Sequence, residues 1–184
     1  MTEEPGDRAP RRGRRRLVSL GVGLVLAAGL WVGLTAAGGS APQQAPAFSL
    51  PRLGGGHAVS YPLTGPDAHE PVVLTFFASW CTPCRSELPM VARVARQAQA
   101  ARDGVVFVGV DGNDDPTSGL AFARSSGVSF AVGADTDSEL APKFALDGYP
   151  GTVFIDGSGR IVHTTHGPVS LAILESYLSQ LSRT

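Results

Sequence analysis

The chain has 184 residues and a formal net charge of −1, which hides an uneven distribution of charge. Six arginines and three acids lie between Met1 and Arg16, whereas the part from Pro42 onward carries nine basic and thirteen acidic residues, a net charge of −4. Its one lysine is Lys143. An acidic globular part without a basic stripe cannot follow a phosphate backbone, which excludes nucleic acid as a partner. The length suits one domain of about 100–150 residues with an appendage.

The N-terminal segment is the clearest targeting signal. Residues 1–16 are rich in arginine, and residues 17–37 form an uncharged run of mostly Leu, Val, Ala and Gly. At about 1.5 Å per residue, a helix of this length approaches the ~30 Å of a bilayer's hydrocarbon core. Closely set arginines stay on the cytoplasmic side. We therefore predict a cytoplasmic basic tail (1–16), a single transmembrane anchor in the cell membrane (17–37) and an extracytoplasmic globular part.

A cleaved signal peptide is the alternative for the same segment. Its apolar region is usually shorter, about 7–15 residues, although Thr35-Ala36-Ala37 could serve as a cleavage site. Cleavage would release the protein as a secreted one. Residues 38–47 contain Gly, Ser, Ala, Pro and Gln without an apolar period, which is typical of a linker. The globular domain is expected at 48–184.

Beyond the linker, strand and helix patterns alternate along the chain. Three glycines at 54–56 divide the segment 48–63 into a predicted hairpin. The run Val72–Ala78 is almost continuously apolar, as in a strand buried on both faces. The other predicted elements are a helix (81–102), a strand (105–110), a helix (115–126), a strand (129–132), a helix (137–146), two hairpin strands (152–156 and 160–165) and a final helix (171–181). This alternation predicts an α/β fold with a mixed sheet.

Cys81 and Cys84 are the only cysteines, and they lie where the buried strand meets the start of a helix. Unpaired N–H groups and the helix dipole at that position lower the pKa of a thiol, and the thiolate is the attacking species in disulfide exchange. Cys84, one turn into the helix, is expected to be more buried than Cys81 and to resolve the mixed disulfide.

Three other interpretations of the cysteine pair are open. A zinc site would need two further ligands, which no second cysteine pair or close histidine pair supplies convincingly. A purely structural disulfide would close a loop too short to stabilise the fold much. Two unrelated core cysteines are the third possibility, although an oxidising compartment argues against them. We favour a redox function.

Two segments of the chain carry a family resemblance. The segment 76–89, FFASWCTPCRSELP, resembles the active-site segment of the thioredoxin superfamily, and most closely that of its membrane-anchored, extracytoplasmic TlpA/ResA branch. The segment 148–161, GYPGTVFIDGSGRI, resembles the second signature of that branch. The resemblance covers about residues 45–182. It implies a thioredoxin fold, with a mixed central sheet flanked by helices, an N-terminal β-hairpin and a central βα insertion, preceded by one transmembrane helix.

The resemblance also implies how a client would bind. The Tyr149–Pro150 peptide bond is expected to be cis and to face the cysteines. The backbone of Tyr149 would then pair with an extended client segment, as in strand addition. Trp80 is expected to pack beside the site and shield it. Thr82 and Pro83, between the cysteines, complete the expected substrate-binding surface.

Glu87 is expected to be the acid of the site. It lies three residues after Cys84 and therefore on the same helix face. Partial burial would raise its pKa and let it carry the proton to and from Cys84, a role that the resemblance also implies. In cytoplasmic thioredoxins the buried acid lies on the preceding strand, where this chain has Thr75. The alternative is a solvated acid that complements the helix dipole.

The expected function is an enzyme of thiol–disulfide exchange outside the cytoplasm. By resemblance, a reductase would serve apocytochrome c or copper-site proteins, and its re-reduction would need a membrane thiol electron donor. An oxidase of folding exported proteins is the alternative, because the sequence does not set the direction of electron flow. A copper chaperone is a weaker hypothesis, because methionine occurs only at positions 1 and 90. A peroxidase is also weaker, because Ala78 stands where the peroxiredoxin motif requires Thr or Ser.

No cofactor or metal is expected beyond a redox-active disulfide between Cys81 and Cys84. The acidic stretch 111–115 could suggest calcium. Pro116 follows it directly, and Asp115 is in the position of a helix N-cap, so we interpret the stretch as a solvated loop.

Overall fold

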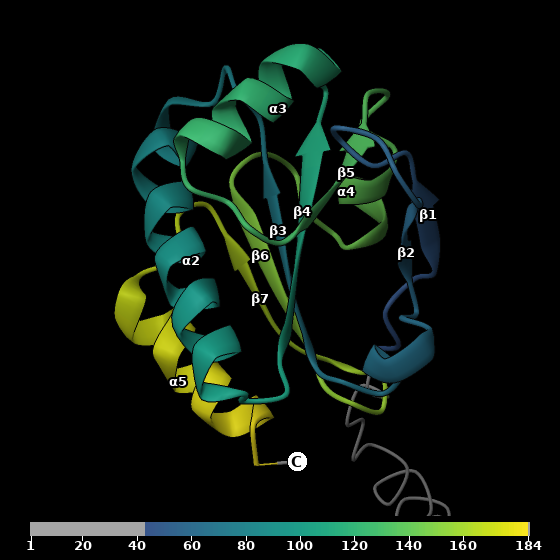
Figure 1. Cartoon of the computed structure of the whole chain (residues 1–184), viewed down its shortest axis with the longest axis vertical. Helices are drawn as coiled ribbons and strands as arrows, with labels where there is room; N and C mark the ends of the chain where they lie inside the picture. Colours follow the sequence, from purple (N-terminus) through teal and green to yellow (C-terminus); the bar gives the residue numbers. More distant parts are fainter. Residues whose placement is uncertain (1–42, 184) are drawn as a thin grey trace, which may run out of the picture. The chain divides into compact units, whose positions relative to one another are not determined.

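The computed structural model describes residues 43–183, and its central strand is the apolar run found in the sequence. All six residues of β3 (Val72–Phe77) are buried. Because successive side chains of a strand point to opposite faces, such a strand must be covered on both sides. Figure 1 shows this arrangement, with two helices on one side of the sheet and a small hairpin with a short helix on the other.

β3 is the middle strand of a five-stranded sheet with the order β5-β4-β3-β6-β7. β4 (Val106–Gly112) runs parallel to β3, and β5 (Ala131–Asp135) runs parallel to β4. β6 (Gly151–Ile155) and β7 (Ile161–His166) form an antiparallel hairpin on the other side. The sheet is therefore mixed, as predicted. The parallel strands β3 and β4 end at the same edge of the sheet (Figure 1).

Two helices cover one face of the sheet. α2 (Thr82–Ala101) and α5 (Leu171–Leu181) lie side by side there (Figure 1). Their apolar residues pack on Val73 and Phe154, whose side chains belong to the same buried cluster. Both helices agree with the sequence prediction, because an apolar residue every three or four positions gives a helix one face to bury.

A separate two-stranded sheet lies on the other face. β1 (Phe48–Leu50) and β2 (Val59–Tyr61) pair antiparallel, which confirms the predicted hairpin, and the short helix η1 (Gly65–Asp67) follows. Partly buried residues of β1 and β2 pack against a cluster that contains Leu74 and Phe76 of the central strand. The hairpin thus buries the second face of β3.

The resemblance implied a central βα insertion in the segment between β4 and β6. It contains α3 (Pro116–Ser125), β5 and α4 (Leu140–Lys143). The Asp115 carboxylate accepts the N–H groups of Thr117 and Ser118, so α3 begins where the cap pattern predicted. The insertion adds β5 to the edge of the sheet.

Two predicted elements differ from the structure. The helix predicted over 137–146 is reduced to α4, because Pro142 has no N–H for a helical hydrogen bond and Ala145 leaves the helix with a φ of 58°. The strand predicted over 129–132 lies two to three residues later, at β5. Its pairing with β4 sets its position, although it contains Gly and Asp, which favour strands little.

The predicted targeting segments lie outside the described residues. These are the basic tail (1–16), the anchor (17–37) and the first half of the linker (38–47). Within residues 43–183, no helix is both long and apolar enough to span a bilayer.

Candidate active site

Cys81 and Cys84 form a disulfide at the junction of β3 and α2, the placement that the sequence predicted. Cys81 is the N-cap residue of α2, and its Sγ accepts the backbone N–H of Cys84 at 3.2 Å. The free N–H groups and the positive end of the helix dipole meet at this position. A thiolate at Cys81 is therefore stabilised once the disulfide is reduced.

The two sulfurs differ in accessibility. Cys84 is fully buried, whereas Cys81 is 3 % exposed. Both belong to an apolar cluster that also contains Phe77 and Leu88. Cys81 is thus the more accessible of the two, and Cys84 has the burial expected of a resolving thiol.

The Tyr149–Pro150 peptide bond is cis, as the resemblance implied. Tyr149 packs against the apolar cluster that contains both cysteines. Its ring meets the Trp80 ring edge-on, with 5.8 Å between centroids, and its hydroxyl forms a hydrogen bond with the Ser138 hydroxyl. The structure therefore brings Trp80 and Tyr149 together beside the disulfide.

The rim of the site is exposed to solvent. Trp80 is 54 % exposed, although its indole N–H donates to the Asn113 carbonyl at 2.8 Å. Thr82 and Pro83, the first residues of α2, are exposed as well. These side chains form a surface on which a client segment could lie, and their part in client binding stays a prediction.

Glu87 is buried and is not the solvated acid of the alternative interpretation. One of its carboxylate oxygens accepts the backbone N–H of Val169 at 3.0 Å. Burial raises the pKa of Glu87 to about 7, against the opposing effects of the Val169 N–H and the Thr152 hydroxyl. A carboxyl group that titrates near neutral pH, one helical turn after Cys84, has the properties of a proton carrier.

Thr75 shows how this site differs from one with an acid on the strand. Thr75 of β3 pairs with Thr152 of β6, and both residues are buried. The Thr152 hydroxyl is close enough to Glu87 to affect its pKa. The buried acid of this site, Glu87, therefore belongs to α2 and acts next to β6, whereas the strand position Thr75 carries no acid.

A group of hydrogen bonds that the sequence did not predict, here called the Asp114 clamp, holds the turn before Cys81. The carboxylate of Asp114 accepts the backbone N–H and the hydroxyl of Ser79, the latter at 2.9 Å. The Arg85 guanidinium donates to the Ser79 carbonyl at 3.0 Å. Ser79 and Asp114 each follow one of the neighbouring parallel strands β3 and β4, which is the only signal in the sequence that could have placed them together.

Asp111 corrects the interpretation of the acidic stretch as a solvated loop. It is 1 % exposed, and neither carboxylate oxygen has a hydrogen-bond partner among the described residues. Burial raises its pKa to about 8, and the neighbouring carboxyl groups of Asp114 and Asp115 act in the same direction. Asp115 is exposed and caps α3, so the interpretation holds for Asp115 and is wrong for Asp111.

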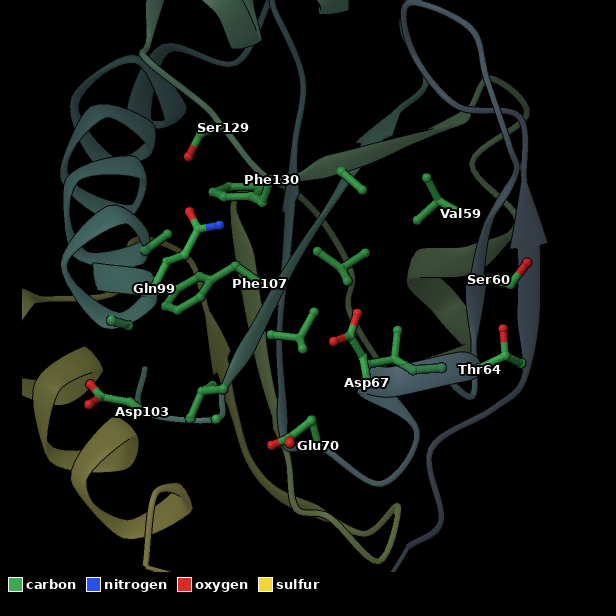
Figure 2. Close-up of a pocket in the computed structure, with 18 of the residues that line it drawn as sticks. Val59, Ser60, Thr64, Asp67, Glu70, Gln99, Asp103, Phe107, Ser129 and Phe130 are labelled. Atoms are coloured by element: carbon green, nitrogen blue, oxygen red, sulfur yellow. The ribbon is translucent and has the colours of Figure 1, made fainter. Parts of the chain in front are cut away.

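The cavity in Figure 2 has a volume of about 570 Å³ and is lined by residues such as Val59, Gln99 and Phe107, but by neither cysteine and not by Glu87. In the part of the chain that the structure describes, no three acidic, histidine or cysteine side chains are arranged to hold a metal ion. The candidate site is formed instead by the residues around Cys81.

Comparison with known proteins identifies related sequences. A model of the AhpC/TSA family matches residues 41–164. The thiol:disulfide interchange protein DsbE of Allochromatium vinosum is 31 % identical over 167 residues, which are 87 % of this chain and 88 % of that protein. The thiol-disulfide oxidoreductase ResA of Bacillus subtilis is 28 % identical over 108 residues, and the match covers 59 % of each chain.

A solved structure agrees with this relationship. A thiol:disulfide interchange protein of the thioredoxin family from Chlorobium tepidum TLS superimposes with a TM-score of 0.65 at 29 % identity. The match covers 78 % of this chain and 98 % of that one. The expected thioredoxin fold and the resemblance to ResA are both confirmed.

Proposed function

Because the chain belongs to the AhpC/TSA family and is a thiol–disulfide oxidoreductase, we propose that it reduces disulfide bonds in exported client proteins. The observation that carries the proposal is the position of Cys81. Its sulfur caps α2, accepts the N–H of Cys84 and is the accessible member of a buried pair. This geometry favours an attacking thiolate at Cys81 and a protected resolving thiol at Cys84.

The reaction moves two electrons from the reduced pair to a client disulfide. The Cys81 thiolate attacks one client sulfur, so that the client S–S bond breaks, a mixed disulfide forms and the first client thiolate leaves. The Cys84 thiolate then attacks the Sγ of Cys81, and the second client thiolate leaves. This step forms the Cys81–Cys84 disulfide that the structure contains. Each released client thiolate takes up one proton.

Glu87 handles the proton of Cys84 in this scheme. A buried thiol has a raised pKa and needs a base before it can attack. Glu87 follows Cys84 on the same helix face, is itself buried and has a pKa of about 7. It can therefore accept the Cys84 proton in its ionised form and return it in its protonated form, with the Val169 N–H holding the carboxylate in place.

Trp80 and Tyr149 hold the client. Their rings meet edge-on beside the disulfide, and Trp80 keeps more than half of its surface free. A client segment would lie along the backbone of Tyr149 before Pro150 and would contact Thr82 and Pro83, so that its sulfur reaches Cys81. Pairing through backbone groups makes this binding tolerant of client sequence.

The N-terminal segment supports an extracytoplasmic location of the catalytic domain. Five arginines close together, followed by an apolar run of 21 residues, suit a membrane anchor with the domain outside the cytoplasm. Disulfides form in that compartment, so a reductase there needs its own electron supply, for which we propose a membrane thiol donor. Apocytochrome c and copper-site proteins are the proposed clients. No cofactor beyond the Cys81–Cys84 disulfide is required.

The reduction potential of the pair tests the direction of electron flow. It is measured on the full chain in detergent by equilibration with glutathione or dithiothreitol. A value near that of thioredoxin, about −270 mV, supports a reductase. A value near that of DsbA, about −120 mV, overturns the reductase and makes an oxidase of folding exported proteins the better proposal.

A further inference from the structure

Asp111 is a buried acid that the exchange reaction described above does not use. It pairs with Phe77 of β3 and with Ala134 of β5, two neighbours without charge. Neither of its carboxylate oxygens has a hydrogen-bond partner within residues 43–183, and neither salt bridge found there involves it. An ionised carboxyl group in such a place loses its hydration without compensation. A buried polar group of this kind calls for a physical explanation.

The fold makes room for this carboxyl group in α3. A Cβ atom placed on Gly119 would lie 1.8 Å from Oδ2 of Asp111. Only a residue without a side chain at that position lets the Asp111 carboxyl group pack against the helix backbone. The group is therefore built into the interface between β4 and α3.

The loop that directly follows Asp111 holds the active-site turn. Asp114 accepts the N–H and the hydroxyl of Ser79, and the Asn113 carbonyl accepts the indole N–H of Trp80. Ser79 and Trp80 are the two residues before Cys81. The charge on Asp114 also acts on Asp111, because it opposes the ionisation of that carboxyl group.

Asp111 is also close to Tyr149 of the candidate active site. A Cβ atom on Gly112 would lie 2.0 Å from the Tyr149 hydroxyl oxygen, so the phenol ring packs on the backbone next to Asp111. Burial raises the pKa of Tyr149, and the charges of Asp135 and Asp111 add to that effect. Asp114, Asp115 and Tyr149 are thus the titratable groups that face Asp111.

We propose that Asp111 is a positioning residue for thiol–disulfide exchange. In its neutral form it leaves the hydrogen bonds between Ser79 and Asp114 intact. In its ionised form it weakens these hydrogen bonds and disfavours the Cys81 thiolate. The inference rests on the proposed function. The sign follows from like charges, since a second carboxylate repels Asp114 and adds negative potential where a thiolate must form. The pKa of about 8 places this change just above neutral pH.

The test is the pH dependence of Cys81 alkylation by iodoacetamide in the reduced full chain. Cys84→Ala is the common background, so that a single thiol reacts. Asp111→Asn keeps the shape and removes the charge, and Asp137→Asn is the control, because Asp137 is an exposed acid in the loop after β5. We expect Asp111→Asn to react on the order of threefold to tenfold faster than its background at about pH 8.5, and Asp137→Asn to react as its background does.

If Asp111→Asn leaves the pH profile of the alkylation rate unchanged, the inference is overturned. A change of the rate by the same factor at every pH overturns it as well, because a merely structural role would give no inflection near the pKa of Asp111. If Asp111→Asn does not fold, the carboxyl carbon of Asp111 is titrated by NMR in the unsubstituted chain. A pKa that is the same in the dithiol and disulfide forms overturns the inference, and a pKa that differs between them supports it. Failure of the proposed function would be seen differently, because the unsubstituted chain would then reduce no client disulfide. The alkylation experiment does not depend on that result.

Discussion

The carboxylate of Glu87 accepts the backbone N–H of Val169 at 3.0 Å, although 82 positions separate the two residues. Val169 directly precedes Ser170, the N-cap residue of α5. The bond therefore ties the active-site helix α2 to the start of the C-terminal helix. A hydrogen bond to an ionised carboxylate is stronger than one to a neutral carboxyl group. The proton on Glu87 thus weakens a link between two helices while it is held for Cys84.

Replacing Glu87 with Gln should remove a pH dependence of stability. Burial raises the pKa of Glu87 from 4.5 to about 7, so the folded protein binds this proton more tightly than the unfolded chain does. The stabilisation is fully present below about pH 4.5 and is lost as the pH rises to about 7, by at most about 3 kcal/mol.

The free energy of unfolding of the oxidised protein in urea, measured at about pH 5 and about pH 8, checks this expectation. The decrease between the two values should be smaller in Glu87→Gln than in the unsubstituted protein. Glu139→Gln is the control, because Glu139 is an exposed acid at the start of α4. An equal decrease in Glu87→Gln and in the control would contradict the buried, high-pKa assignment.

Cys84→Ala should trap clients on Cys81. The first step, attack by Cys81 on a client disulfide, needs no second cysteine, whereas release of the mixed disulfide does. Covalent adducts should therefore accumulate and should disappear with dithiothreitol on a non-reducing gel. Cys81→Ala is the matched control, and it should trap far less because Cys84 is fully buried. Equal trapping by both variants would argue against the assigned order of attack.

Trp80→Ala should weaken client binding more than it slows chemistry. The ring is 54 % exposed and meets Tyr149 edge-on, so its removal takes away contact area without touching either sulfur. An aromatic side chain that a bound client covers contributes about 1–2 kcal/mol or more, so KM for a client peptide should rise roughly tenfold with little change in kcat.

Val162→Ala is the control for Trp80→Ala, because Val162 is another exposed apolar side chain, 44 % exposed, on β7. It should leave KM unchanged. A similar rise of KM in both variants would show that Trp80 has no particular part in binding.

Gly112→Ala should displace Tyr149 and destabilise the protein. The added Cβ would lie 2.0 Å from the Tyr149 hydroxyl oxygen and 2.5 Å from its Cζ, so the ring must move. Overpacking of this kind costs about 1–3 kcal/mol. Thermal unfolding and client reduction should both be impaired. Gly148→Ala is the control, since no atom lies within 4 Å of its Cβ position. Equal melting temperatures for the two variants would contradict the packing of Tyr149 on Gly112.

Periodicity and local chemistry were enough to predict most of the fold. An apolar run predicted β3, the apolar spacing of three and four predicted α2 and α5, and Asp115-Pro116 predicted the start of α3. The helix predicted over 137–146 failed because Pro142 interrupts the pattern, and the strand predicted over 129–132 was misplaced because pairing with β4 sets its position.

The sequence by itself determined the reactive centre, because the placement of Cys81 at the end of a buried strand and the start of a helix depends only on neighbouring residues. The tertiary structure decided which acids have a raised pKa. Glu87 is buried against Val169 and Asp111 against Gly119, and these partners come from other segments of the chain. A pKa depends on hydration and on nearby charges in space. Two carboxyl groups that look equally soluble in the sequence can therefore titrate near neutral pH only because the fold removes them from water.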